Sequence, residues 1–316
     1  MSNFRTTIST KKYPFDINYS SKILFLGSCF SDHVSQKILD GGFSVVANPF
    51  GVLYNPISIK NAFNIFLEKK QFEESDLIFN QGLYHSFFHH GQFSNPSKEK
   101  ALEQINKSIS LHQQFVKNAD FIFITFGTSY VYRHTEQNII VSNCHKLPTK
   151  TFDHFSLTIE EIVLEYTPLL KALKVQNPNL QIIFTVSPIR HWKDGAHENQ
   201  LSKARLHLAI EELQNRFDFV HYYPSYEIIM DDLRDYRFYA KDMIHLNTQA
   251  VNYIYEHFRN SFYKSETQII EKRVIKLKQA LNHRPFNPDT IEHRDFIKHT
   301  KQKIEQLLLE YPEINI

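Results

Sequence analysis

The sequence predicts an α/β protein in which helices cover both faces of a parallel central sheet, a three-layer α/β/α sandwich. Short apolar runs of strand length alternate along the chain with longer segments of helical spacing. Two of these runs, at 121–126 and 181–186, are largely apolar, as strands buried on both faces are. Such alternation indicates parallel strands joined by crossover helices, with functional groups at the carboxyl ends of the strands.

The first predicted strand is 22–27, which ends in a glycine and is followed by a helical pattern. A second short strand at 45–47 leads into 48–51, a loop rich in turn residues. Residues 71–98 then depart from the pattern, because aromatic and histidine side chains crowd there, and we expect an insertion in the core fold. The remaining predicted elements are helices at 57–67, 98–118, 158–175, 200–217 and 248–260, a polar loop at 133–157, and strands at 121–126, 181–186 and 219–223.

From Lys264 onward the sequence becomes charged and helix-forming, with an interruption at 283–288. We therefore expect one α/β domain over 1–262, carrying an insertion at about 71–98, and a C-terminal helical extension over 263–316. The extension is predicted to pack outside the core or on a partner, where it would be a dimer contact. The sequence leaves the oligomeric state open.

Composition narrows the class of protein. The 316 residues are 42% hydrophobic and 22% charged, as in folded globular proteins, and the net charge of +2 gives no reason to expect nucleic acid as a partner. Two cysteines are too few for a disulfide scaffold. The first ten residues lack a signal-peptide pattern, and no run approaches the roughly 20 apolar residues of a membrane span. These features predict a cytoplasmic protein without membrane association.

Ser28 is the first candidate for chemistry. It directly follows the first strand and its glycine and stands at the start of a helix. The N-terminus of a helix offers N–H groups and a partial positive potential to a developing oxyanion. Serine is also a preferred N-cap, so the Gly-Ser pair alone leaves a purely structural role open.

The second candidate is the segment from Asp242 to His245, just before the last core helix. A carboxylate three residues before a histidine can accept from Nδ1–H, which leaves Nε2 free to take a proton from a hydroxyl. A solvent-facing pair is the alternative. The chain order of serine, aspartate and histidine on an α/β pattern is one that catalytic triads adopt.

Gly27-Ser28-Cys29-Phe30-Ser31 resembles the signature of the GSCFA family, with Ser31 at the position of a final small residue. The resemblance extends over roughly residues 20–260 through further ordered blocks. These blocks are 48–56, 126–132, 143–148, 187–191 and 242–245.

The GSCFA family resembles the SGNH or GDSL hydrolases, which implies a three-layer sandwich and ester, thioester or acyl-sugar chemistry. By motif, Ser28 matches the nucleophile of that superfamily, and Asp242 and His245 match its Asp-x-x-His block. Gly51 matches the glycine whose N–H, together with that of Ser28, lines the oxyanion hole.

The resemblance breaks at one oxyanion-hole position. Ser129 stands where the superfamily has an asparagine whose side chain donates to the oxyanion. Asn143 is the substitute candidate, because it could supply the missing amide donor. Loss of one such donor typically costs on the order of 10² to 10³ in kcat, so this departure bears on activity.

Other side chains invite different interpretations. Cys29 is expected to be a packing residue, since its neighbour holds the nucleophile position. His85 and His89 would bind a metal if they shared a helix face, but the aromatic residues between them favour a loop or strand. The preferred interpretation is an aromatic lid with His85 lining the pocket. Arg190 and His191 follow a predicted strand and are expected either to bind an anionic substrate group or to form a salt bridge.

The sequence therefore predicts a serine hydrolase, an esterase or deacylase without a cofactor, acting on a small-molecule or glycan acyl ester. An acyltransferase using the same site is one alternative. A non-catalytic glycan- or acyl-binding protein on a degenerate hydrolase scaffold is another, and a metal-dependent enzyme built on the histidine-rich segment is a third.

Overall fold

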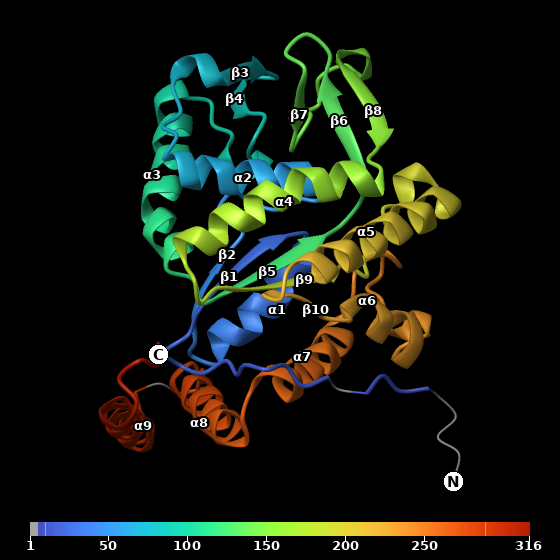
Figure 1. Cartoon of the computed structure of the whole chain (residues 1–316). Coiled ribbons are helices and arrows are strands. Elements are labelled where there is room, and N and C mark those ends of the chain that lie inside the picture. Colours follow the sequence, from blue (N-terminus) through green and yellow to red (C-terminus); the bar gives the residue numbers. More distant parts are fainter. Residues whose placement is uncertain (1–5, 10, 288) are drawn as a thin grey trace.

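The computed structural model describes residues 6–9, 11–287 and 289–316 (Figure 1). Residues 1–5 and Thr10 of the predicted 1–262 domain, and Pro288 of the 283–288 interruption, lie outside the described residues. A parallel five-stranded sheet in the order β10-β9-β5-β1-β2 forms the centre, with helices on both faces and further helices at the C-terminus. The predicted α/β/α fold class with a C-terminal helical extension is confirmed.

The predicted order of elements matches the observed one in the core. The strands of the central sheet are β1 (Lys22–Gly27), β2 (Ser44–Ala47), β5 (Phe121–Phe126), β9 (Gln181–Val186) and β10 (Val220–Tyr222). The helices are α1 (Cys29–Asp40), α2 (Pro56–Glu68), α3 (Lys98–Lys117), α4 (Ile159–Gln176), α5 (Ala196–Arg216), α6 (Ser225–Glu227), α7 (Thr248–Phe262), α8 (Ser265–Leu281) and α9 (Ile291–Glu310).

The sheet is apolar on both faces because it separates two hydrophobic clusters. Leu24 and Leu26 of β1 belong to the cluster that α2, α3, α4 and α5 complete. Ile23 and Phe25 point the other way, into the cluster with α1 and α7. Figure 1 shows α2 and α4 on one side of the sheet and α1 and α7 on the other. Alternate side chains of a strand face opposite sides, so a strand in the middle layer presents apolar side chains to both faces.

The order of strands creates a crevice at one place on the sheet edge. The chain leaves β1 through α1 to reach β2 on one side, whereas β5 pairs with the other side of β1. The loops that follow β1 and β5 therefore diverge at the carboxyl ends of these strands. Open α/β sheets bind their ligands at such a switch point, and Ser28 follows β1 there.

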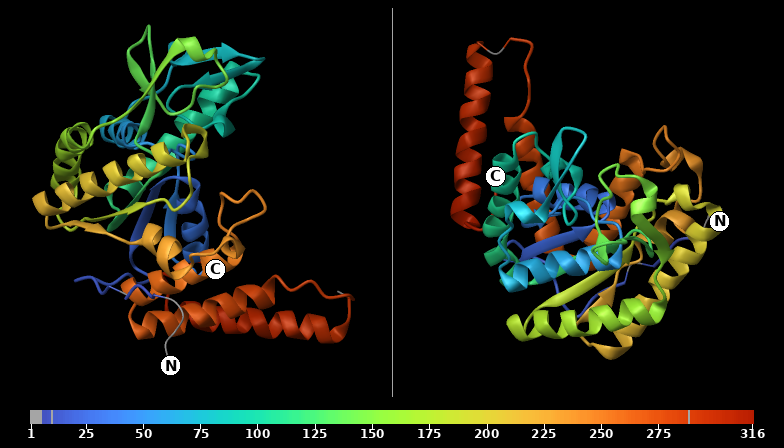
Figure 2. Two further views of the ribbon diagram at one scale, coloured as in Figure 1. Left: turned by 90° about the vertical axis from the view of Figure 1, so that its right-hand side faces the viewer. Right: turned by 90° about the horizontal axis from the view of Figure 1, so that it is seen from above.

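Two insertions stand over the α2 and α4 side of the molecule (Figures 1 and 2). The segment at 71–98 contains the antiparallel hairpin β3 (Leu77–Asn80) and β4 (Leu83–Ser86). The second insertion is a three-stranded antiparallel sheet in the order β7-β6-β8, formed by β6 (Tyr130–His134), β7 (Ile139–Val141) and β8 (Phe152–Ser156).

The prediction of a loop at 133–157 was therefore wrong. The strands there are short and only partly buried, so polar side chains on their open face hide the period-two pattern. A third hydrophobic cluster, built on Phe87, Val141 and Phe152, joins this sheet to the 71–98 insertion. The two insertions therefore share one small apolar core.

The C-terminal helices form a hairpin along the α1 and α7 side of the domain (Figure 2). Ile270 and Val274 of α8 and Leu307 of α9 are buried in the second hydrophobic cluster. The Asn315 N–H donates to the Gly42 carbonyl at 2.9 Å. The extension thus packs on the α/β domain, and its predicted role as a dimer contact stays a prediction. No helix within the described ranges is long and apolar enough to cross a membrane.

Candidate active site

Ser28 is held at the crevice by its neighbours in β1 and α1. Gly27, with φ of +146°, brings β1 so close to β5 that a Cβ on this residue would lie 2.2 Å from the Thr125 carbonyl oxygen. The Ser28 N–H donates to that same oxygen at 3.3 Å, and its Oγ accepts from the Phe30 N–H at 3.4 Å. Ser28 is the N-cap of α1 and only 1% exposed. Its hydroxyl therefore lies at the positive end of a helix, sheltered from solvent.

The Asp242–His245 turn orients the imidazole. Oδ2 of Asp242 lies 2.5 Å from Nδ1 of His245, and Oδ1 accepts from the N–H groups of Ile244 and His245 at 3.0 and 2.9 Å. These hydrogen bonds lower the pKa of Asp242 to about 2. A charged carboxylate at Nδ1 fixes the tautomer with the proton on Nδ1. Nε2 of His245 makes no hydrogen bond within the described part of the chain.

Ser28 and His245 belong to the same edge of the sheet. Arg190 follows the carboxyl end of β9 and donates to the Met243 carbonyl, which ties the Asp242–His245 turn to that edge. Ile244 of the turn and Cys29 beside the serine both pack on the second hydrophobic cluster. No hydrogen bond joins Ser28 to His245. The side chain of His245 is 47% exposed, whereas Ser28 is buried, so the two groups are oriented by separate sets of hydrogen bonds.

The predicted oxyanion-hole groups are mostly engaged elsewhere. Gly51, with φ of +75°, donates its N–H to the Asn48 carbonyl at 2.7 Å and closes a tight turn. The hydroxyl of Ser129 contacts those of Ser156 and Ser202 at 2.8 and 3.1 Å. The next N–H after Gly51, that of Val52, makes no hydrogen bond to any described residue.

A cavity of about 500 Å³ opens between the two insertions and the segment that follows β9. Asn143, the substitute oxyanion candidate, lines it, and its Oδ1 accepts from the His145 N–H at 2.9 Å. Val52, Tyr54 and His191 line the side toward the sheet, whereas Ser28 is not part of the lining. Tyr130, Tyr132 and His154 supply ring faces. The cavity is therefore mixed in character, with aromatic rings and many polar groups.

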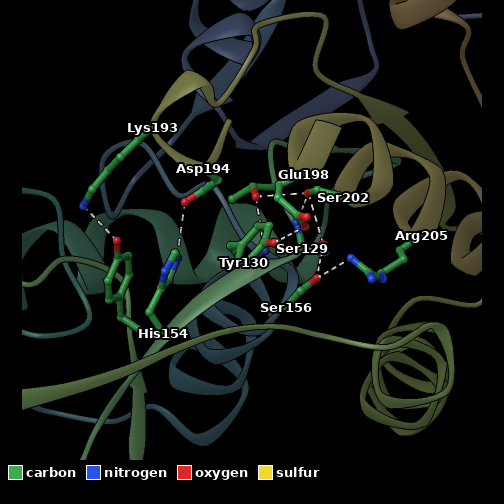
Figure 3. Close-up of polar contacts among 11 residues, drawn as sticks. Ser129, Tyr130, His154, Ser156, Lys193, Asp194, Glu198, Ser202 and Arg205 are labelled. Atoms are coloured by element: carbon green, nitrogen blue, oxygen red, sulfur yellow. Dashed lines mark hydrogen bonds and ion pairs between the residues drawn. The ribbon is translucent and has the colours of Figure 1, made fainter. Parts of the chain in front are cut away.

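Polar contacts fix the second insertion against the chain that follows β9, as Figure 3 shows. Each contact joins a side chain within 130–156 to one within 193–205. The contacts are Tyr132 Oη with Lys193 Nζ at 2.9 Å, His154 Nε2 with Asp194 Oδ1 at 3.6 Å, Tyr130 Oη with Glu198 Oε2 at 2.6 Å, and Ser156 Oγ with Arg205 Nη1 at 2.9 Å. This wall of the cavity is thus held by side chains from two distant segments.

His85 and the other histidines of the first insertion have structural partners. Nδ1 of His85 lies 2.6 Å from the Ser94 hydroxyl, and its ring stacks on that of His145 at 4.4 Å between centroids. His89 stacks on Phe50, and burial lowers the pKa of His89 to about 3. His85 lies in β4, so it shares no helix face with His89. No group of three potential metal-ligating side chains occurs in residues 6–9, 11–287 and 289–316.

The two residues predicted to bind an anionic group differ in environment. The guanidinium of Arg190 lies 4.9 Å from the ring centre of Trp192 and 5.4 Å from that of Tyr239. His191 lines the cavity, and burial, with the nearby charge of Lys203, lowers its pKa to about 3. A neutral His191 offers a hydrogen bond but no positive charge. Arg190 forms no salt bridge with the described residues.

The structure adds residues that the sequence did not single out. Asn48 accepts from the Gly27 N–H at 2.9 Å and donates to Asp32 at 2.6 Å, which supports the turn before the serine. Lys203 of α5 is 2% exposed and lies under the carboxyl ends of β5 and β9. A lysine in the buried stripe of a helical pattern is a signal in the sequence, because an apolar residue is expected there.

These observations define a class: an α/β sandwich with a sheltered serine at the switch point and an oriented Asp–His pair at the same sheet edge. The chain belongs to the GSCFA family, whose model matches residues 22–258. Residues 274–316 match the C-terminal domain of GSCFA domain proteins. The family resemblance carried by the 27–31 motif is therefore confirmed. No curated protein matches the chain.

Some solved structures resemble the chain weakly. A candidate platelet activating factor from Streptococcus pneumonia is 12% identical with a TM-score of 0.37, covering 76% of this chain and 83% of that one. A carbohydrate esterase of family 3 from Talaromyces cellulolyticus is 10% identical with a TM-score of 0.36, covering 80% and 99%. An acetyl xylan esterase from Butyrivibrio proteoclasticus is 11% identical with a TM-score of 0.36, covering 77% and 64%. Likenesses at this level carry no argument about activity.

Proposed function

We propose that this protein is a serine-dependent hydrolase of acyl esters, with Ser28 as nucleophile, His245 as general base and Asp242 as the group that orients the histidine. One observation carries the proposal. The imidazole of His245 is fixed through Nδ1 by a carboxylate 2.5 Å away, and no described residue engages its Nε2 at the sheet edge where Ser28 caps a helix.

The proposed reaction follows from these roles. Oγ of Ser28 attacks the ester carbonyl while Nε2 of His245 takes the hydroxyl proton, and the carbonyl electrons form an oxyanion. Collapse of this intermediate breaks the bond to the alcohol, which receives the proton from His245. A water molecule, activated by the same histidine, then releases the acid and restores Ser28. The first step requires Ser28 and His245 to approach to about 2.6–3.2 Å, a distance that often closes only when substrate is bound.

The oxyanion would be stabilised by N–H groups near Ser28. The first turn of α1 contributes the positive end of its helix. The N–H of Val52, which has no partner among the described residues, is a better candidate than that of Gly51, because the Gly51 N–H closes the turn onto Asn48. Oδ1 of Asn143 is hydrogen bonded, whereas its amide NH2 has no partner among the described residues, so Asn143 is a candidate side-chain donor in place of Ser129.

The cavity of about 500 Å³ is the candidate site for the remainder of the substrate. This volume suits a small molecule or one or two sugar rings. Its lining mixes ring faces with polar side chains, which favours a polar alcohol portion over a long acyl chain. His191 and Asn143 are the polar groups that we propose contact it.

Labelling by a fluorophosphonate probe tests the proposed function. The probe phosphonylates an activated serine, so we expect labelling of the wild type and none of Ser28→Ala. Cys29→Ala is the matched control, because the adjacent thiol has its pKa raised by burial and is proposed only to pack. Labelling that persists in Ser28→Ala, or a folded wild type that is never labelled, contradicts the proposed function.

One observation favours a second candidate function. Ser28 is 1% exposed and forms no hydrogen bond with His245, as expected of a protein that binds an ester or glycan without cleaving it. A folded wild type that resists the probe yet binds an acylated glycan would support this function. An acyltransferase differs from a hydrolase only in the acceptor. Product formed on an added sugar in preference to water would identify it.

A further inference from the structure

The buried face of α5 carries a polar stripe where the helical pattern calls for apolar side chains. Asn199, Ser202 and Lys203 are 4%, 1% and 2% exposed. They lie on the same face of α5 as the core residue Leu206, at helical spacing, and face the carboxyl ends of β5 and β9. Removing a polar group from water costs free energy, so buried polar groups nearly always have a hydrogen-bond partner. Their partners are therefore informative about what α5 holds in place.

Lys203 makes the strongest of these contacts. Its Nζ donates to the carbonyl oxygens of Gly127 and Ser187 at 2.6 Å each and to that of Ile189 at 3.0 Å. An ammonium group has three N–H donors, and all three are used. No N–H of the described backbone donates to these three oxygens. Lys203 thus supplies the hydrogen bonds for the backbone carbonyl groups that follow the neighbouring strands β5 and β9.

The other residues of the stripe hold the same two segments. Ser202 Oγ accepts from the Ser129 N–H at 2.8 Å, immediately after β5. Asn199 Oδ1 accepts from the His191 N–H at 3.0 Å, in the loop after β9. The hydroxyl of Ser129, at the position of the missing oxyanion asparagine, is therefore part of this structural cluster.

The loop after β9 connects Lys203 to the turn that carries the proposed catalytic histidine, His245. Ile189, which Lys203 holds, is followed directly by Arg190, and the Arg190 guanidinium donates to the Met243 carbonyl. Met243 has a φ of +59°, a conformation that an unbranched non-glycine side chain adopts at a cost. A contact at its carbonyl helps to maintain that conformation, on which the Asp242–His245 hydrogen bond depends.

We propose that Lys203 is a positioning residue: its side chain fixes the carboxyl ends of β5 and β9 and, through Arg190 and Met243, the turn that carries Asp242 and His245. The expected effect of Lys203 on the reactivity of Ser28 rests on the proposed function, whereas its effect on the 240–247 turn does not. Lys203 does not touch the reacting atoms.

The charge of Lys203 is part of this role. Burial lowers the pKa of Lys203 to about 7, and the interaction with Cys29 offsets part of this shift. Hydrogen bonds to three carbonyl oxygens also stabilise the protonated form. The titratable groups that feel this charge are Cys29 of α1, His191 after β9 and His207 of α5. None of these is a carboxylate, and the three carbonyl oxygens are the hydrogen-bond partners of the buried ammonium.

A double-mutant cycle with Lys203→Met and Arg190→Met tests the proposal. The first variant removes the ammonium, and the second removes the link to Met243. Two quantities are measured: the rate of Ser28 labelling by the fluorophosphonate, and amide hydrogen exchange of 240–247. We expect each single variant to lower the labelling rate about 10- to 100-fold and to speed exchange in 240–247. The double variant should be no worse than the more severe single variant, because both act through one connection.

Arg259→Met is the matched control. Arg259 is a largely buried cation that pairs with Glu271 in the other hydrophobic cluster, at 2.5 Å, so its loss destabilises the protein without touching this connection. We expect a lower melting temperature but wild-type labelling and exchange at 240–247. If Lys203→Met does not fold, Lys203→Gln, which keeps a donor without the charge, is used in its place.

The outcomes separate this inference from the proposed function. Faster exchange at 240–247 in both single variants of a protein that is never labelled supports the positioning role and contradicts the hydrolase. Wild-type labelling and exchange in the Lys203 variant, or multiplicative effects in the double variant, overturn the positioning role while the hydrolase stands.

Discussion

Replacing Gly27 with alanine perturbs the contact that places Ser28. Gly27 pairs with Thr125 at the end of β1, and its φ of +146° lies where L-residues are strained. An added Cβ would lie 2.2 Å from the Thr125 carbonyl oxygen and 2.8 Å from the Thr125 Cβ. Neither neighbour is the flexible end of a side chain, so the β1 and β5 backbones must separate.

Two effects add to the cost of Gly27→Ala. Backbone strain at a φ of this kind costs about 1–3 kcal/mol. Forcing a methyl group into a packed contact costs a further 1–3 kcal/mol or so. We therefore expect the free energy of unfolding to fall by about 2–6 kcal/mol, and the melting temperature by roughly 3–9 °C for a chain of this length. The separation also moves Ser28, so labelling by the fluorophosphonate should fall by at least about tenfold.

Gly82→Ala is the matched control for the assay. Gly82 has a φ of +78° at the tip of the β3–β4 hairpin, but nothing lies within 4 Å of an added Cβ. Gly82→Ala should therefore lower the free energy of unfolding by about 1 kcal/mol through backbone strain alone. Labelling of Ser28 should not change. Thermal unfolding of the two variants is compared with that of the wild type. Equal destabilisation of Gly27→Ala and Gly82→Ala, with unchanged labelling of both, would refute the reasoning.

Three further predictions concern single charged or titratable groups. Asp242→Asn should slow Ser28 labelling about 10²- to 10⁴-fold, because the carboxylate sets the tautomer of His245. The melting temperature should hardly change, since the Asp242–His245 pair is exposed. Glu271→Ala should lower the free energy of unfolding, measured in urea, by about 3–5 kcal/mol, because it leaves Arg259 without its partner. Burial lowers the pKa of His89 from 6.5 to about 3, so the unfolded chain binds the proton first and stability falls as pH drops from 6.5 towards 3. Between pH 6.5 and 4.5 this loss is about 2–3 kcal/mol, and urea unfolding of His89→Phe should show a correspondingly weaker pH dependence, whereas an unchanged dependence would contradict the assignment.

The core strands could be predicted from sequence because their signal is local. A strand buried on both faces, such as 121–126, is apolar at nearly every position, and the printed sequence shows this directly, with Thr125 as the exception. The strands at 130–156 gave no such signal, because each is short and only one face is covered. Their partner, the Phe87 segment, lies some forty residues away and could not be matched to them by periodicity.

The candidate site shows the same division. The Gly27-Ser28 pair and the Asp242-to-His245 spacing are local patterns, and the second proved to be a hydrogen-bonded turn. Gly51 and Ser129 were assigned to the oxyanion hole by motif, but an N–H or hydroxyl can donate to an oxyanion only if it has no other partner. Here the Gly51 N–H donates to the Asn48 carbonyl, and the Ser129 hydroxyl contacts the hydroxyls of two distant serines.

The amino-acid sequence by itself determined the layers of this protein, the order of its core elements and the family to which it belongs, since these follow from side-chain periodicity and from short motifs. Only the tertiary structure decided which polar groups are engaged and which are unpaired. It brought Lys203 beneath the ends of β5 and β9 and linked Arg190 to the turn of His245. The physical reason is that a hydrogen bond between distant segments depends on the packing of the whole chain, which leaves no periodic trace in either segment.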